Sequence, residues 1–316
     1  MRPPRSMTLL VSSVSARGRA LRLGRDVVAA LRAGGWEVHV SVTSTASDVE
    51  ELSRTCSDYY IGALGGDGYL ASAATGRVGH EGVLVPFPGG RGNDLCRYLG
   101  IGVDPVAWAQ QLAEADRATM DRWTGPLDAV EVTSAEGTKT ALGIISLGID
   151  ATANWVGNHS WLRSGPLAYA WGAVVGFAGG FKPWPIEARI DGRATELGGW
   201  LTSVSNTGWF GGGVNILPQS RADDGTLEII NVEKMSRLRA LPLLGRALVA
   251  RQIDHPMITV KMGRKIEMMR PVGLRALADG DVVGHLPLSM RVIPDALTVV
   301  APGQQVERTV DIRTEK

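Results

Sequence analysis

The sequence predicts an α/β first domain with a mostly parallel sheet, followed by a β-rich antiparallel second domain. In the first third of the 316 residues, short apolar runs alternate with stretches that can form helices, which is typical of parallel strands joined by crossover helices. From about Trp123 the runs become shorter and alternating, and Asp-Gly and Glu-Gly turns separate them, which favours antiparallel strands. We therefore expect an α/β domain over residues 1–122 and a β-rich domain over residues 123–295.

The individual elements follow from this pattern. A helix is expected at Ser47–Thr55, with Ser47 as its N-cap and Glu50 completing a capping box. The other elements expected in the first domain are strands at Met7–Val11, Trp36–Val42, Tyr59–Leu64 and Gly82–Phe87, and helices at Arg19–Ala33, Tyr69–Gly76 and Leu95–Leu99. In the second domain the expected strands include Ala129–Thr133, Glu187–Ile190, Leu227–Val232 and Met257–Val260.

Composition excludes several classes of protein. The net charge of +1 gives no sign of bulk attraction to nucleic acid. No run approaches eighteen uninterrupted apolar residues, and the short run Met7–Val11 fits a first strand better than a signal peptide, so we expect a soluble, cytoplasmic protein without a transmembrane segment. Cys56 and Cys96 suit a reducing compartment, with one disulfide left open, and the five histidines show no zinc-ligand spacing.

Two glycine-rich turns are the most informative motifs. Gly65–Gly68 (Gly-Gly-Asp-Gly) and Gly90–Asp94 (Gly-Arg-Gly-Asn-Asp) each follow an apolar run and precede a helix start. A strand, a glycine turn and a helix together hold a phosphate, because backbone N–H groups point at the anion. Asp67 and Asp94 in these turns imply an accompanying cation, so the pair predicts a nucleotide with Mg²⁺. The alternatives are an ordinary Asp-Gly turn at Asp67 and a helix N-cap at Asn93-Asp94.

These turns, with further motifs along nearly the whole chain, resemble the diacylglycerol kinase catalytic domain shared by bacterial lipid kinases and sphingosine kinases. The motifs are Leu64–Gly68, Pro86–Gly100, Leu147–Ala151, Ser164–Tyr169, Gly211–Gly213, Asp224–Leu227 and Asp279–Asp281. The resemblance implies a two-domain kinase that uses ATP and Mg²⁺ to phosphorylate a lipid hydroxyl, such as that of diacylglycerol. It also implies that Ala296–Val300, within a C-terminal segment of residues 296–316, returns to the first domain. NAD kinase shares only the first of the two glycine turns, so we favour it less than the diacylglycerol kinase family.

The resemblance also implies roles for single residues. The bacterial enzymes place the general base in the motif matching Asp279–Asp281, which implies Asp279 as the base, while sphingosine kinases imply Asp67. Asp281 stands where the family has Glu, and Asp224 resembles a structural metal loop, although by pattern alone both motifs can be hairpin turns. The implied metal ligands are Asp67, Asp224 and Asp281. The implied nucleotide-binding residues are Ser12, Thr43, Gly65, Gly66, Asp67, Gly68, Tyr69, Gly90, Arg91, Gly92, Asn93 and Asp94.

Several residues depart from the family pattern near the phosphates. The departures are Ser12-Ser13 for Asn-Pro, Tyr69 for Thr, Ala71-Ser72 for Asn-Glu and Arg91 for Thr. Arg91 can compensate, because a guanidinium pairs well with phosphate. The departures leave open a catalytically silent nucleotide- or lipid-binding protein on the same fold, which the retained aspartates argue against.

Two stretches are candidates for contact with a membrane surface. Trp155–Trp184 is rich in tryptophan, and Lys234–Arg251 carries arginines among leucines. Core packing and a solvated helix face are the respective alternatives. The acceptor alcohol remains open, and a homodimer is a possible assembly.

Overall fold

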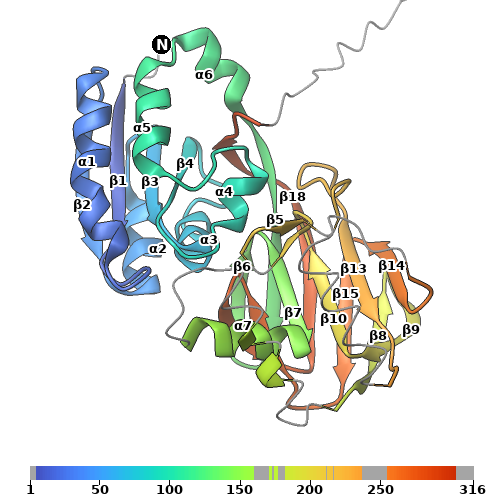
Figure 1. Cartoon of the computed structure of the whole chain (residues 1–316). Helices are drawn as coiled ribbons and strands as arrows, with labels where there is room; N and C mark the ends of the chain where they lie inside the picture. The colour runs from blue at the N-terminus through green and yellow to red at the C-terminus, as the bar shows by residue number, and fades with distance from the viewer. Residues whose placement is uncertain are drawn as a thin grey trace, which may run out of the picture.

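The computed structural model describes residues 5–159, 171–172, 174–176, 182–210, 212–215, 217–236 and 255–303. The motif Ser164–Tyr169, residue Gly211, residues 237–251 of the basic stretch and the tail beyond residue 303 lie outside this part of the chain. The described residues form two lobes, which two long strands connect (Figure 1).

The first lobe is a parallel sheet with helices on both faces (Figure 1). Its strands are β1 (Ser6–Ser12), β2 (Glu37–Thr43), β3 (Tyr60–Gly65) and β4 (Val83–Pro88), in the order β2-β1-β3-β4. Its helices are α1 (Arg19–Ala33), α2 (Ala46–Thr55), α3 (Asp67–Thr75), α4 (Asp94–Tyr98), α5 (Pro105–Glu114) and α6 (Arg117–Trp123). Because crossovers are right-handed and β1 lies between β2 and β3, α1 covers one face and α2 and α3 the other. Helix α5 packs beside α1.

The start of α2 differs from the sequence-based prediction. The helix begins at Ala46, and Thr45 is its N-cap, since the Thr45 Oγ1 accepts the N–H of Asp48 at 3.2 Å. Ser47 is therefore wrong as the N-cap. The extended backbone of Thr45 (φ −120°, ψ 156°) aims its hydroxyl over the first turn, whereas Ser47 is already inside the helix.

The second lobe packs two antiparallel layers face to face. One layer is a six-stranded sheet in the order β14-β13-β10-β7-β16-β17. Its strands are β7 (Ile144–Gly148), β10 (Leu201–Ser205), β13 (Leu227–Val232), β14 (Ile258–Gly263), β16 (Arg275–Ala278) and β17 (Asp281–His285). The opposing strands are β5 (Thr124–Ser134), β6 (Gly137–Ala141), β8 (Trp184–Ile190), β9 (Arg193–Gly199), β15 (Lys265–Arg270) and β18 (Leu288–Val300). Helix α7 (Ile149–His159) and the short strands β11 (Trp209–Phe210) and β12 (Val214–Asn215) complete the lobe.

Each lobe has its own core. Leu9, Leu64 and Phe87 are fully buried in the first, and Ile145, Val204 and Met290 lie between the layers of the second. This architecture confirms the predicted fold class, an α/β first part with a mostly parallel sheet and an antiparallel β-rich second part.

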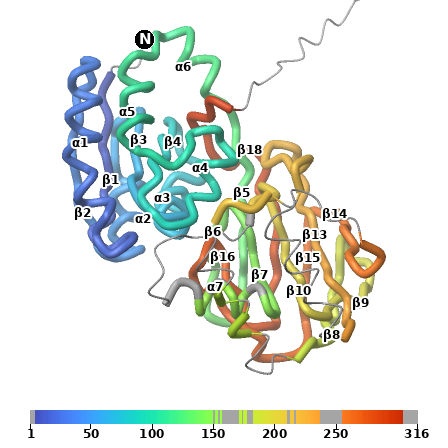
Figure 2. Tube along the Cα trace, viewed as in Figure 1, coloured from blue at the N-terminus to red at the C-terminus, as the bar shows by residue number. Residues whose placement is uncertain are grey.

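Strands β5 and β18 run side by side from one lobe into the other (Figure 2). The end of β18, residues 296–300, pairs in parallel with β4 through Thr298 and Val299, so one ten-stranded sheet spans both lobes. The β5–β18 register shifts at the crossing, and the buried Asp128 holds this point, because its Oδ1 accepts the N–H of Asp295 at 2.8 Å and its Oδ2 that of Gly225 at 2.7 Å.

Two further sequence expectations can be compared with the described residues. Cys56 and the buried Cys96 are both free thiols. Among the helices in the described ranges, none is long and apolar enough to cross a bilayer.

Candidate active site

The two glycine turns lie against each other at the carboxyl ends of β3 and β4. The N–H of Gly89 donates to the carbonyl of Gly65 at 2.7 Å. A Cβ atom at Gly90 would stand 2.5 Å from the Cα of Gly66, so the close approach requires glycine there. Strand pairing between β3 and β4 thus places both turns in a single site.

The side chain of Asn93 shapes the second turn. Asn93 has a left-handed backbone (φ 56°), which asparagine tolerates better than most residues. Its Oδ1 accepts the N–H of Gly90 at 2.8 Å, and its Nδ2 donates to the Gly90 carbonyl at 3.2 Å. Asn93 is the N-cap residue of α4, but its side chain makes no capping bond and closes the turn instead.

Asp67 and Asp94 connect the turns to each other and to the second lobe. The Oδ1 of Asp67, the first residue of α3, accepts the N–H of Leu95 at the start of α4 at 3.1 Å. The Oδ2 of Asp94 accepts the N–H of Gly212, between β11 and β12, at 2.8 Å. Both carboxylates are thus fixed in the interface between the lobes.

The turn between β16 and β17 brings two more aspartates to the same place. Asp279 has a left-handed backbone (φ 50°), and both of its oxygens are engaged. Its Oδ2 accepts the N–H of Leu142 at 2.8 Å, and its Oδ1 accepts those of Gly143 at 2.9 Å and Ile144 at 3.2 Å. The hairpin turn expected from the pattern is therefore present, and three backbone donors hold its first carboxylate.

Asp281 reaches across to the first glycine turn. A Cβ atom at Gly68 would overlap its Oδ2. The Asp281 side chain is open to solvent on one side, and within the described residues no hydrogen bond engages its carboxylate. Among the aspartates of this site, Asp281 therefore combines contact with the first lobe and access from solvent.

Burial and mutual repulsion make these carboxylates weak acids. Burial raises the pKa of Asp67. Burial, and then the charge of Asp67, raise the pKa of Asp94 to about 7. Burial raises the pKa of Asp279 to about 7 against the opposing effect of its backbone donors, and burial also raises the pKa of Asp281. Since a cation would relieve this repulsion, the site favours one.

The residues present fit a Mg²⁺ ion. The Oδ1 of Asp94 is buried without a hydrogen-bond partner. A Cβ atom at Gly92 would lie 3.1 Å from the Oδ2 of Asp67 and 3.7 Å from the Oδ2 of Asp94, so both carboxylates flank this glycine. Among the described side chains, no three His, Cys, Asp or Glu residues form a ready-made metal cluster. An ion here would take one or two carboxylates and complete its shell with phosphate and water oxygens, as Mg²⁺ commonly does.

Hydroxyl and guanidinium groups lie on the other side of the turns. The Oγ of Ser12 accepts the N–H of Ser15 at 3.0 Å, and the Ser15 Oγ accepts the N–H of Gly66 at 3.3 Å. The Nη1 of Arg19 donates to the Gly90 carbonyl at 3.4 Å. Burial, and then the neighbouring Arg17, lower the pKa of Arg91. The surroundings of the turns therefore suit an anion.

Sequence reasoning missed Ser15, Arg17 and Arg19. All three lie in or next to the connection from β1 to α1. Because β1 is a central strand of a parallel sheet, the residues after its carboxyl end are where ligands bind. Their position directly after the first predicted strand could therefore have identified them as candidate ligand-binding residues.

Tyr69 and Thr43 form a pair at the edge of the site. The Tyr69 Oη lies 2.7 Å from the Thr43 Oγ1, and its ring covers Gly65, where no Cβ would fit. Burial raises the pKa of Tyr69 to about 12. Tyr69 therefore ties α3 to the end of β2.

Asp224 lies apart from this cluster, and the side chain of the aspartate in the motif Leu147–Ala151 is not described. The Oδ1 of the exposed Asp224 accepts hydrogen bonds from the N–H and the hydroxyl of Thr226. Burial raises the pKa of Asp128, and the charge of Asp224 adds to this rise. Asp224 belongs to the region where β5 and β18 cross. Asp150 lies in α7, and its side chain is outside the described part of the structure.

Comparisons with known proteins match both halves of the chain. Residues 6–124 match the diacylglycerol kinase catalytic domain, and residues 143–301 match the YegS C-terminal NAD kinase beta sandwich-like domain. A "Diacylglycerol kinase" of Mycobacterium tuberculosis is 26% identical over 94% of this chain and 95% of its own. A "Probable lipid kinase YegS-like" of Pseudomonas syringae is 27% identical over 88% of each chain.

Solved structures give the same fold. A diacylglycerol kinase structure from Bacillus anthracis superposes with a TM-score of 0.73 at 18% identity, covering 95% of this chain and 98% of that one. With both halves of the chain matched in order, the protein belongs to the family in which the diacylglycerol kinase catalytic domain is followed by the YegS C-terminal NAD kinase beta sandwich-like domain.

Proposed function

We propose that the protein is an ATP- and Mg²⁺-dependent lipid kinase that transfers the γ-phosphoryl group to a lipid hydroxyl such as that of diacylglycerol. The observation that carries this proposal is the meeting of Asp67 and Asp94, from the glycine turns, with Asp281 of the second lobe. Acidic groups at a phosphate-type turn suit a nucleotide with its cation. The names of the relatives supply the substrate class.

The turns would bind the phosphates, and Arg19 and Arg91 would offset their charge. Asp67 and Asp94 would hold Mg²⁺, whose chemistry when bound is to neutralise charge on the phosphate oxygens. Asp224 is not supported as a ligand of this ion, because its carboxylate lies by the β5–β18 crossing.

The geometry favours Asp281 as the general base. It would accept the proton of the acceptor hydroxyl while the hydroxyl oxygen bonds to the γ-phosphorus and the bond to the bridging oxygen of ADP breaks. Three backbone N–H groups occupy the oxygens of Asp279, so we assign that residue to positioning the turn that carries Asp281. Asp279 as the base, which the family resemblance implied, remains the competing hypothesis, and so does Asp67.

The acceptor would approach from a membrane. Trp155, Trp171 and Trp184 are exposed in the second lobe, which agrees with apolar contact at an interface rather than core packing. The indole of Trp155 also lies 5.6 Å from the Arg275 guanidinium carbon. These exposed rings support a lipid acceptor over a small water-soluble alcohol.

The test is transfer from γ-labelled ATP to diacylglycerol in mixed vesicles, with Mg²⁺ and with excess chelator. We expect labelled phosphatidic acid only with Mg²⁺, and none with Asp67→Asn. If the wild type binds ATP but transfers phosphate to neither diacylglycerol nor a total lipid extract, the silent-protein alternative replaces the proposal.

A further inference from the structure

The hairpin formed by β5 and β6 holds β17, the strand that begins at Asp281. Strand β17 is at the edge of its sheet, so the backbone groups on its outer side need partners from elsewhere. The Oγ of Ser134 donates to the Val283 carbonyl at 3.2 Å, and the Nζ of Lys139 donates to the Val282 carbonyl at 2.9 Å. Side chains of the opposing layer therefore satisfy two carbonyls of this edge.

The hairpin also holds the far end of β17. The Oε1 of Glu136, in the turn between β5 and β6, lies 2.8 Å from the Nδ1 of His285, and its Oε2 accepts the N–H of His285 at 3.4 Å. A Cβ atom at Gly284 would overlap the Oγ of Ser134, so glycine allows this close approach. The hairpin thus fixes β17 along its length, and Asp281 stands at the start of the fixed strand.

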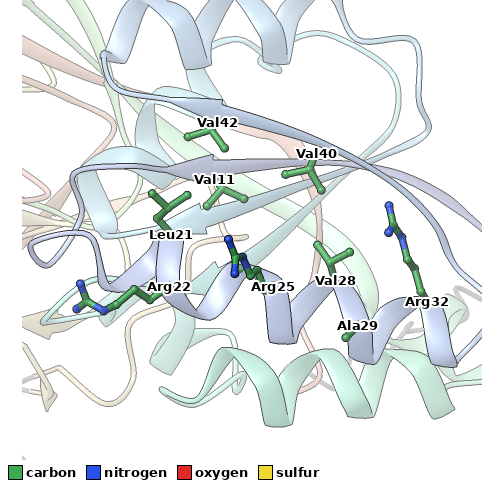
Figure 3. Close-up of a pocket in the computed structure, with 10 residues that line it drawn as sticks. Val11, Leu21, Arg22, Arg25, Val28, Ala29, Arg32, Val40 and Val42 are labelled. Atoms are coloured by element: carbon green, nitrogen blue, oxygen red, sulfur yellow. The ribbon is translucent and has the colours of Figure 1, made fainter.

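The same hairpin touches the first lobe. Strand β6 packs against α3, whose first two residues are Asp67 and Gly68 (Figure 1). The hairpin therefore lies between the first glycine turn and the strand that carries Asp281. A groove of about 820 Å³ between α1 and β2, lined by Arg25 and Val40, lies on the other face of the parallel sheet, which α1 covers (Figure 3). Substitutions in the hairpin should therefore leave that groove intact.

Lys139 is the member of the hairpin that acts on Asp281 by charge as well as by contact. Its side chain is exposed, yet its Nζ is bonded to the carbonyl one residue after Asp281. Burial raises the pKa of Asp281, and the ammonium of Lys139 opposes this rise. One side chain therefore influences both the backbone and the charge of the residue that enters the first glycine turn.

We propose that Lys139 is a positioning residue for Asp281, which it keeps over Gly68 through its bond to the Val282 carbonyl and its positive charge. The inference rests on the proposed function in one respect, the role of Asp281 as the general base. Lys139 would touch neither ATP nor the acceptor hydroxyl. Its loss should therefore lower turnover and leave ATP binding unchanged, because a small displacement of the base is enough to slow proton transfer.

The kinetic test uses the full chain with labelled ATP and a monomeric short-chain diacylglycerol, so that vesicle binding does not enter. Lys139→Met keeps the apolar stem and removes the charge, and it should lower kcat on the order of 10- to 100-fold while changing the KM for ATP less than about twofold. Lys139→Arg, which keeps a charged donor, should stay within about threefold of the wild type. The matched control, Lys261→Met on the exposed face of β14, removes equal charge elsewhere and should leave kcat unchanged.

A double-mutant cycle tests whether Lys139 acts through Asp281. In an Asp281→Asn background, Lys139→Met should cause little further loss of kcat, because the group that it positions is already gone. An undiminished loss in that background would overturn the proposal. So would a raised KM for ATP at unchanged kcat, which would make Lys139 a nucleotide ligand.

A measurement without turnover separates this inference from the lipid-kinase proposal. The backbone amide of Gly68 lies under the Asp281 carboxylate and reports its position in an NMR spectrum of glycine-labelled protein, where Gly68→Ala identifies the peak. Lys139→Met should move this peak, whereas Lys139→Arg and Lys261→Met should leave it in place. An unmoved peak in Lys139→Met would overturn the proposal. A moved peak in a protein whose wild type phosphorylates no lipid would support the placement of Asp281 by Lys139 and count against the kinase activity alone.

Discussion

The Oδ2 atom of Asp281 occupies the space that a Cβ atom of residue 68 would need. Gly68 therefore lets a carboxylate of the second lobe enter the first glycine turn. We expect Gly68→Ala to displace Asp281 and lower turnover on the order of 10²-fold, because a displacement of about 1 Å is enough for such a loss. Alanine favours the helix at this position, so the melting temperature should not fall by a matching amount.

Gly24→Ala is the matched control. Its Cβ atom would make ordinary contacts with Val11 at 3.5 Å in the middle of α1. It should keep full activity and add roughly 0.5–1 kcal/mol to the free energy of unfolding. Full activity in Gly68→Ala would show that the contact between the lobes at this point is not used in the reaction.

The two aspartates of the β16–β17 turn should respond differently to amide substitution. Asp281→Asn should lower kcat by 10²–10⁴-fold with little change in ATP affinity or stability, as expected for loss of a general base. Asp279→Asn should lower the free energy of unfolding by about 1–3 kcal/mol, because its amide group would face backbone N–H donors that the carboxylate now satisfies. Steady-state kinetics and urea denaturation of both variants separate the roles. The reverse pattern would return the base to Asp279.

The elements of the fold were readable from the sequence because their signals are local. Apolar runs and glycine turns place β3, β4 and the two phosphate-type turns within a few residues of their observed bounds. The pairing of β18 with both β4 and β5 is not a local signal, since it joins residues that are far apart in the sequence, such as Leu288 with Ser134 and Thr298 with Val83. The family resemblance implied only that residues 296–300 return to the first domain, without naming the strands with which they pair.

The site was predictable in its residue types but not in its contacts. The aspartates of the turns stand out by sequence. That three backbone N–H groups of residues 142–144 would engage Asp279 depends on how the β6–β7 connection packs, which no spacing encodes. The same applies to Tyr69, whose replacement of Thr was visible but whose bond to Thr43 required the sheet and α3 to be placed together.

The Tyr69–Thr43 bond should be measurable as a coupling energy. Tyr69→Phe and Thr43→Val each remove one hydroxyl at nearly constant volume, and the double variant removes the pair. We expect each single variant to lose about 0.5–1.5 kcal/mol in the free energy of unfolding, with the double variant losing clearly less than the sum. Additive losses in urea denaturation would mean that the two hydroxyls contribute independently.

Stability should fall as the pH rises toward neutrality in metal-free buffer. The pKa of Asp94 and that of Asp279 are each about 7 in the folded protein, against an ordinary value of 3.8. Between about pH 4 and pH 7 the folded protein therefore keeps protons that the unfolded chain has lost. The contribution of these two carboxyl groups to the free energy of unfolding is therefore full below pH 4. It is lost as the pH rises through 7, because the unfolded state binds fewer protons than the folded state between these pH values.

A cation should reverse this trend, because it binds the ionised carboxylates. We expect the rise in melting temperature on adding Mg²⁺ to be small at pH 5.5 and to grow as the pH passes through 7. Asp94→Asn should flatten the metal-free pH profile and reduce the Mg²⁺ effect, whereas Asp121→Asn, which removes an exposed carboxylate of α6, should leave both unchanged. A Mg²⁺ effect of equal size at pH 5.5 and pH 8 would place the ion away from Asp94, because only a ligand that titrates in this range couples metal binding to the proton in this way.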